Sequence, residues 1–169
     1  MLWLRGLLPL TRTALSPPPE IVWEFEHPDK DDIQRKQGTL TYGSDASGGC
    51  HSRDPRLRVW AGAQVAVADV GQERSPKFRV LSAQFGSVQG RQTVPRGELQ
   101  YARRALHDSI AYNACLMSDA LYVVKFWLQG KVVGINADEW QKVKDLHQVN
   151  TRCGARCQAL HVRSRQDRK

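Results

Sequence analysis

The apolar residues of this chain change their spacing near Pro95, and this change constrains the fold more than any other feature of the sequence. Before Pro95, apolar and polar side chains alternate, as expected of strands that bury one face. The alternation occupies three segments, residues 38–44, 58–69 and 78–85. After Pro95, Leu99, Ala102 and Leu106 recur at the spacing of one helical face. Proline itself suits a first helical position because its missing N–H costs nothing there. The sequence therefore predicts three strands followed by a helix.

Four further elements are predicted after this helix. They are strands at residues 110–117 and 158–162 and helices at residues 120–128 and 137–146. Helices that separate strands form crossover connections, which join strands that run parallel in one sheet. The fold class that follows is α/β, with a five-stranded mixed sheet flanked by helices.

Residues 1–37 are interpreted as a leader and linker, and residues 38–169 as one domain. Residues 16–19 (SPPP) cannot continue a helix or a central strand, and residues 20–37 are rich in charge without a clear period. We therefore expect residues 20–37 to form a loosely ordered connection. The first fifteen residues contain two arginines and no acidic residue, which fits a mitochondrial transit helix or a fragment of an upstream domain, and they are too short to span a bilayer.

The excess of basic residues indicates a polyanionic partner. Twenty-five lysines and arginines stand against seventeen acidic residues, which gives a formal net charge of +8 and a pI near 9.6. A positive field attracts phosphates and releases their counterions, although a basic protein without such a partner also fits the composition. Four cysteines are too few for the disulfide framework of a small secreted domain, and no secretory signal is evident. We expect an intracellular protein, nuclear, cytoplasmic or mitochondrial, with no membrane partner.

Four residues near the C-terminus have the chemistry of zinc ligands but not the arrangement of a compact site. They are His147, Cys153, Cys157 and His161. Structural zinc sites usually hold their cysteines within a tight turn. Here Cys157 leads directly into the strand expected at residues 158–162. Zinc is therefore the less favoured interpretation of these residues.

Three carboxylates, Asp45, Glu98 and Asp119, are predicted at element boundaries: after the first strand, in the first turn of the first helix and after the fourth strand. Taken singly, a turn, a helix dipole and an N-cap explain them. Helical geometry, however, places Glu98 between Ala102 and Ala105 at the margin of the apolar face, where a carboxylate is costly unless a cation meets it. If the first and fourth strands are neighbours, Asp45 and Asp119 emerge at the same end of the sheet. This arrangement predicts a site for magnesium, or manganese, because hard cations prefer carboxylate oxygens.

Arginines gather around the start and the outer face of the predicted helix. They are Arg91, Arg96, Arg103 and Arg104. A planar guanidinium binds phosphate through paired hydrogen bonds, so the cluster predicts contact with a nucleic-acid backbone, with a solvated helix face as the alternative. Trp127 and Trp140 have rings that can stack on bases, but their helical spacing is more typical of core residues.

Three segments, in this order, resemble the ribonuclease H family. They are residues 45–49 (DASGG), 92–99 (QTVPRGEL) and 118–124 (SDALYVV). The second is similar to the QTVPRAEL stretch of retroelement-encoded members. Residues 136–140 (NADEW) and 161–165 (HVRSR) also resemble segments of that family, so the likeness extends over about residues 38–165.

This resemblance implies a five-stranded ribonuclease H sheet and a magnesium-dependent endonuclease that cleaves RNA paired to DNA. Structured RNA is an alternative partner. By the same resemblance, Asp45, Glu98 and Asp119 match three of the family's four metal-binding, catalytic carboxylates.

Departures from the family pattern limit this expectation. Ala46 replaces the usual glycine, and Arg165 stands where a histidine is usual. The resemblance also implies that residues 38–169 lack the family's last helix with its fourth carboxylate, and Asp167 falls too early in the pattern to replace it. We therefore expect at best a weak nuclease. The alternatives are a catalytically inactive nucleic-acid-binding module and a non-functional retroelement remnant.

Overall fold

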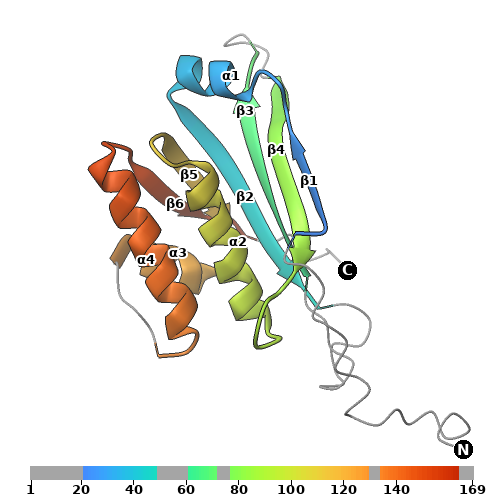
Figure 1. The fold of residues 1–169 in the computed structure, drawn as a ribbon, viewed down its shortest axis with the longest axis vertical. Helices are drawn as coiled ribbons and strands as arrows, with labels where there is room; N and C mark the ends of the chain where they lie inside the picture. The colour runs from blue at the N-terminus through green and yellow to red at the C-terminus, as the bar shows by residue number, and fades with distance from the viewer. Residues whose placement is uncertain (1–20, 49–60, 72–76, 130–133, 164–169) are drawn as a thin grey trace, which may run out of the picture.

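The computed structural model describes residues 21–48, 61–71, 77–129 and 134–163. These residues form one mixed sheet with helices packed on it (Figure 1). In chain order the elements are β1 (Trp23–Glu26), α1 (Lys30–Gln37), β2 (Thr39–Ser47), β3 (Ala61–Asp69), β4 (Phe78–Ser87), α2 (Val94–Asp108), β5 (Asn113–Ser118), α3 (Leu121–Gln129), α4 (Ala137–Arg152) and β6 (Cys157–His161). The strands lie in the order β1-β4-β3-β2-β5-β6. The pairs β1–β4, β4–β3 and β3–β2 are antiparallel, whereas the pairs β2–β5 and β5–β6 are parallel. The predicted class, α/β with a mixed sheet flanked by helices, is confirmed, with six strands in place of five.

The additional strand, β1, and the first helix, α1, lie within residues 20–37, which were expected to form a loosely ordered connection. β1 pairs with β4, beginning with Trp23 opposite Phe85. α1 follows and ends at Gly38, whose left-handed conformation (φ 71°) suits a residue without a side chain. The expectation is therefore wrong for residues 23–37. A strand of four residues is too short to show a period, and β1 forms because the edge of β4 offers it hydrogen-bonding partners. The domain boundaries stay a prediction.

A buried lysine fastens this N-terminal segment to the rest of the fold. Lys30 is only 6% exposed, and its ammonium group donates to Asp108 at 2.6 Å and to Glu26 at 3.0 Å. The second oxygen of Asp108 accepts a hydrogen bond from the hydroxyl of Ser82 at 2.9 Å. Burial alone would lower the pKa of Lys30, but the hydrogen bonds and charges of the two carboxylates raise it above its usual value. Two ion pairs of Lys30 thus join α1 to the end of β1 and to the C-terminal turn of α2.

α2, α3 and α4 cover one face of the sheet, and the hydrophobic core lies between these helices and the strands (Figure 1). The largest apolar side chains of this core that are less than 2% exposed are Leu40, Tyr42, Leu81, Leu99, Leu106, Leu116 and Val123. Trp127 and Trp140 belong to the same cluster and are each 4% exposed. The interpretation of these tryptophans as core residues is confirmed, and neither ring is accessible to a base.

No helix in the described part of the chain covers the opposite face of the sheet, which we call the open face. It carries Trp23, Phe25, Gly43, Asp45, Ala63, Val65, Ala83, Phe85, Met117 and Leu160, which are paired across the strands. Side chains alternate between the two faces of a strand, so in β2 Leu40 and Tyr42 are buried under the helices while Gly43 and Asp45 are exposed.

Two element boundaries near the acidic residues differ from the prediction. β2 continues through Ser47, because Asp45 to Ser47 pair with β3, so Asp45 lies inside the strand and not after it. α2 begins at Val94, one residue before Pro95, with Thr93 as its N-cap. Glu98 therefore belongs to the second turn of the helix and not to the first.

Several predictions from the sequence concern residues that the structure does not describe. Residues 1–15, with their transit-helix and upstream-fragment interpretations, lie outside the described residues, and so do Arg165 and Asp167. Among the helices that are described, none combines the length and the apolar character needed to cross a membrane.

We expect Lys30→Met to lower the free energy of unfolding by about 3 kcal/mol, because it leaves the largely buried carboxylate of Asp108 without its cation. Lys36→Met, on an exposed position of the same helix, is the matched control and should change stability by less than about 0.5 kcal/mol. Urea denaturation followed by circular dichroism measures both. Equal losses in the two variants would show that the Lys30 ion pair does not hold the segment in place.

Candidate metal centre

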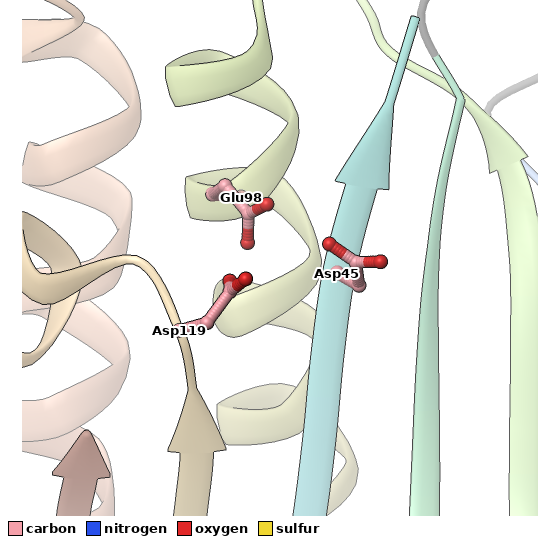
Figure 2. Close-up of side chains that lie close together, drawn as sticks. All are labelled: Asp45, Glu98 and Asp119. Carbon is pink, nitrogen blue, oxygen red and sulfur yellow. The ribbon is translucent and has the colours of Figure 1, made fainter. Parts of the chain in front are cut away.

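The strands β2 and β5 separate at the end of the sheet where the acidic residues lie. Their parallel pairing ends at Gly43 opposite Met117, whereas β2 stays paired with β3 as far as Ser47. Asp45 lies two residues beyond the last pair with β5, and Asp119 follows β5 directly. The two strands are neighbours, as the sequence analysis required, and both aspartates border the opening between them (Figure 2).

A glycine lets α2 approach this opening closely. A Cβ atom at Gly97 would lie 2.7 Å from the Cβ of Ala46 and 2.9 Å from the Cγ2 of Val88, both closer than real side chains come. The backbone of α2 therefore lies against β2, and the next residue, Glu98, reaches the opening. Its Oε1 accepts a hydrogen bond of 2.9 Å from the backbone N–H of Ala46.

The structure brings the three predicted carboxylates together from three separate elements (Figure 2). One oxygen of each of Asp45, Glu98 and Asp119 lies within 4.8 Å of an oxygen of the other two. Glu98 is 3% exposed, whereas the two aspartates are exposed. One buried and two exposed carboxylates therefore lie together. We call these three residues the acidic cluster.

Glu98 is the electrostatically unusual member of this cluster. Burial raises its pKa to about 8, the nearby charges of Asp45 and Asp119 raise it too, and the hydrogen bond from Ala46 opposes them. Its Oε2 is buried, and no hydrogen-bond partner for it lies among the described residues. A buried oxygen without a partner is costly, and a cation bound between the three carboxylates would relieve both this cost and the mutual repulsion. Because all the donors are oxygens, the residues fit a hard divalent cation such as Mg²⁺ or Mn²⁺.

Within the described residues, the acidic cluster is the only group of three or more His, Cys, Asp or Glu side chains close enough to hold an ion. The zinc interpretation named His147, Cys153, Cys157 and His161, and the structure does not gather these residues. Cys157 and His161 are the two ends of β6, and a strand separates residues four apart by roughly 13 Å. They cannot share one tetrahedral ion.

Hydrogen bonds outside the acidic cluster hold Asp119 in position, and sequence reasoning missed them. The backbone carbonyl of Asp119 is 3.1 Å from Nε2 of His161. The hydroxyl of Tyr122, in the first turn of α3, donates to the carbonyl of Pro95 in α2 at 2.7 Å. Burial raises the pKa of Tyr122, so its hydroxyl stays protonated and remains a donor. The segment that carries Asp119 is thus tied both to β6 and to the helix that carries Glu98.

A cavity of about 520 Å³ opens beside the acidic cluster on the open face. It is lined by Gly43, Ser44, Asp45, Ala63, Val65, Met117, Ser118, Asp119 and Val162. Apart from the two aspartates, the residues of this lining are small or apolar. The acidic cluster therefore lies at one side of a largely uncharged hollow that a ligand can enter.

The arginines predicted to contact nucleic acid occupy different environments. Arg91 is exposed, and Arg104 is partly buried. The guanidinium of Arg96 donates to the carbonyl of Gln89 at 2.6 Å and pairs with both oxygens of Asp138 at 2.9 and 2.6 Å. This pairing lowers the pKa of Asp138 to about 2. Arg96 thus joins α2 to α4 and is largely occupied within the protein.

A buried carboxylate on α4 forms the centre of these contacts. Glu139 is 1% exposed and receives hydrogen bonds from Arg103 at 3.1 Å and from Lys142 at 2.9 Å. Arg96 and Gln100 lie at 3.3 and 3.4 Å from the same carboxylate. Sequence reasoning missed this network, because residues 96 and 139 are far apart in the chain.

Solved structures with a similar fold are ribonuclease H domains. The PFV RNase H domain matches with a TM-score of 0.57 and 13% identity over 78% of this chain and 84% of that chain. The foamy viral protease-reverse transcriptase in complex with an RNA/DNA hybrid matches at 0.54 and 13%, over 78% of this chain but only 18% of its own length. The N-terminal RNase H domain of a Mycobacterium tuberculosis protein matches at 0.52 and 17%, over 76% and 86%.

The chain therefore has the ribonuclease H-like fold, in agreement with the resemblance found in its motifs. No protein-family model matches the sequence, and no curated protein matches it. At these identities the likeness concerns the fold, and the chemistry must be argued from the residues of this chain.

The raised pKa of Glu98 predicts a pH-dependent stability in the absence of divalent cations. Between pH 4.5 and about pH 8, the native state keeps a proton on Glu98 that the unfolded chain has released. The free energy of unfolding should therefore fall as pH rises through this range and level off above it. Glu98→Gln does not titrate and should lack this decline. Urea denaturation in chelator-treated buffer from about pH 5 to about pH 9 measures the effect. The same decline in Glu98→Gln would assign it to other groups.

Proposed function

We propose that this protein is a metal-dependent nuclease that hydrolyses the RNA strand of RNA–DNA hybrids. The observation that supports the proposal is the acidic cluster at the separated ends of β2 and β5, in a chain with the ribonuclease H-like fold. The foamy viral structure of similar fold was determined with an RNA/DNA hybrid, which makes this substrate the first to test.

In this proposal Asp45, Glu98 and Asp119 hold magnesium. When bound, divalent ions in such a site activate the attacking water and stabilise the leaving oxygen of the phosphodiester. The exposed aspartates face the cavity, so they are open to a phosphate that enters from the open face. Glu98 contributes from the buried side, where Oε1 accepts a hydrogen bond from the N–H of Ala46 and Oε2 is available to the ion. Occupation of the site removes the proton that Glu98 otherwise keeps below about pH 8.

The basic excess of the chain supports a nucleic-acid substrate, because a net charge of +8 attracts a polyphosphate backbone. Among the predicted phosphate contacts, we propose that Arg91 contributes more than Arg96. Arg91 is exposed, whereas the donors of Arg96 already serve Gln89 and Asp138. Arg103 likewise donates to Glu139. The exposed arginine therefore has less intramolecular hydrogen bonding to give up than these two.

The test of the proposed function is cleavage of an end-labelled RNA–DNA hybrid in magnesium. We expect cleavage of the RNA strand only, and a loss of at least about a hundredfold in Asp45→Asn and in Asp119→Asn. Asp31→Asn, an exposed carboxylate on α1, is the control and should cleave like the unaltered protein. Mn²⁺ binding followed by calorimetry should weaken in the same two variants. Hybrid binding without any metal-dependent cleavage would replace the nuclease with an inactive binding module.

We expect Arg91→Ala and Arg96→Ala to have opposite consequences. Arg91→Ala should weaken hybrid binding without changing stability and should reduce the slope of log affinity against log salt by about one. Arg96→Ala should instead lower the free energy of unfolding by roughly 2–3 kcal/mol, because it removes a cation from the buried Glu139. Fluorescence anisotropy over a salt series and urea denaturation measure the two effects. An unchanged salt slope in Arg91→Ala would remove Arg91 from the interface.

A further inference from the structure

The strand that sequence analysis missed carries exposed aromatic residues. Trp23 and Phe25 on β1 and Phe85 on β4 are 47%, 39% and 45% exposed. Their rings are stacked: the centroids of Trp23 and Phe85 lie 5.5 Å apart, and those of Trp23 and Phe25 lie 6.4 Å apart. We call these three residues the aromatic platform. Aromatic rings of this size are usually buried in a core or at an interface, so three of them together on a face that no described helix covers indicate a binding surface.

The aromatic platform lies on the same face of the sheet as the acidic cluster. Trp23 is opposite Phe85, Phe85 is opposite Ala63, and Ala63 is opposite Asp45. Opposite residues in neighbouring strands point to the same face, so these four form one row across the sheet. Three strand spacings separate its ends, which is roughly 14 Å. The cavity beside the acidic cluster covers part of the same row, since Ala63 and Asp45 line it.

The charges around the aromatic platform do not oppose a polyanion. The two acidic residues of β1, Glu24 and Glu26, alternate with Trp23 and Phe25 and therefore point to the opposite face. The next row of the open face contains Ala83, Val65 and Gly43, which carry no charge. Among the described residues, the side chains between the rings and the acidic cluster are thus small or apolar and uncharged, within a chain whose net charge is +8.

From this geometry we infer that the aromatic platform binds unpaired nucleobases by stacking, on a single-stranded segment that continues from a strand held at the acidic cluster. The inference rests on the proposed function, because it takes the acidic cluster as the point where the nucleic acid is held. Every base has a flat π face, so stacking on exposed rings binds single strands without reading their sequence. A protein partner is less well matched, because the path between the rings and the acidic cluster offers it only small side chains.

The experiment measures binding by fluorescence anisotropy in Ca²⁺ in place of Mg²⁺, which keeps the carboxylates occupied, and a gel of the same samples verifies that the hybrid stays intact. The ligands are a blunt RNA–DNA hybrid, the same hybrid with a short single-stranded extension at either end in turn, and the single strand alone. We expect one of the two extensions to tighten binding roughly tenfold. The double variant Trp23→Ser/Phe25→Ser should lose this gain and still bind the blunt hybrid as before. Phe78→Ser, which alters a 72% exposed aromatic residue at the other end of β4, is the matched control and should keep the gain.

A second variant guards against a loss caused by misfolding. Phe85→Leu keeps an apolar side chain next to Trp23 but removes a ring, so it should keep the fold by circular dichroism and lose part of the gain. A gain that persists in both variants, or no gain from either extension, would overturn the inference. A change of oligomeric state in the double variant, measured by sedimentation, would instead make the open face an interface between copies of the chain and would also overturn it.

The same measurements separate this inference from the proposed function. Hybrid cleavage by a protein that gains nothing from an extension leaves the nuclease standing and removes the aromatic platform. An extension gain that depends on Trp23, in a protein that does not cleave, leaves the aromatic platform standing and removes the nuclease.

Discussion

The early end of the pairing between β2 and β5 is the constraint on which the candidate site depends. If the two strands stayed paired beyond Gly43 and Met117, their backbones would close the sheet where the side chain of Glu98 now enters. Because they separate there, a helix on one face and two aspartates at the end of the sheet can meet at one point. The site is thus a property of sheet topology, and the helix N-cap, the tie through Tyr122 and the contact at Ala46 adjust its geometry. The burial that brings Glu98 to this point also raises its pKa, so position and protonation have the same physical origin.

Periodicity predicted most of the sheet and the helices because these elements bury one side. The inward orientation of Glu98 was visible for the same reason, since residues of one helix turn share a face with the apolar residues around them. β1 escaped prediction because its four residues alternate aromatic and acidic side chains over too short a length, and its existence depends on the edge of β4. The continuation of β2 through Ser47 was not predicted, because residues 45–47 include types that are common in turns. They form a strand because they pair with β3. Local sequence carries no information about such partners.

Basic residues on a helix illustrate a second limit of sequence reasoning. A count of arginines treats each one as a charge available to a partner. In the structure, Arg96 and Arg103 meet Glu139, a carboxylate that is itself almost fully buried. A buried carboxylate of this kind needs its cations, so these arginines are required by the packing of α2 against α4 whatever the protein binds. These ion pairs leave the net charge unchanged, but they leave fewer arginines available to a partner than the sequence suggested.

The close contact between Gly97 and Ala46 connects two departures from the family pattern. The similar retroelement stretch, QTVPRAEL, has alanine at the helix position and the family usually has glycine at the strand position; this chain has the reverse. Here the strand supplies the methyl group, and a second one at Gly97 would lie too close both to it and to the Cγ2 of Val88. An exchange between the two arrangements by single substitutions must pass through either two alanines or two glycines. Two alanines would overfill the contact and push the helix that carries Glu98 away, whereas two glycines leave only a methyl-sized gap and a more flexible helix turn. The route through two glycines is therefore the easier one, and Val88 must also shift before an alanine fits at position 97.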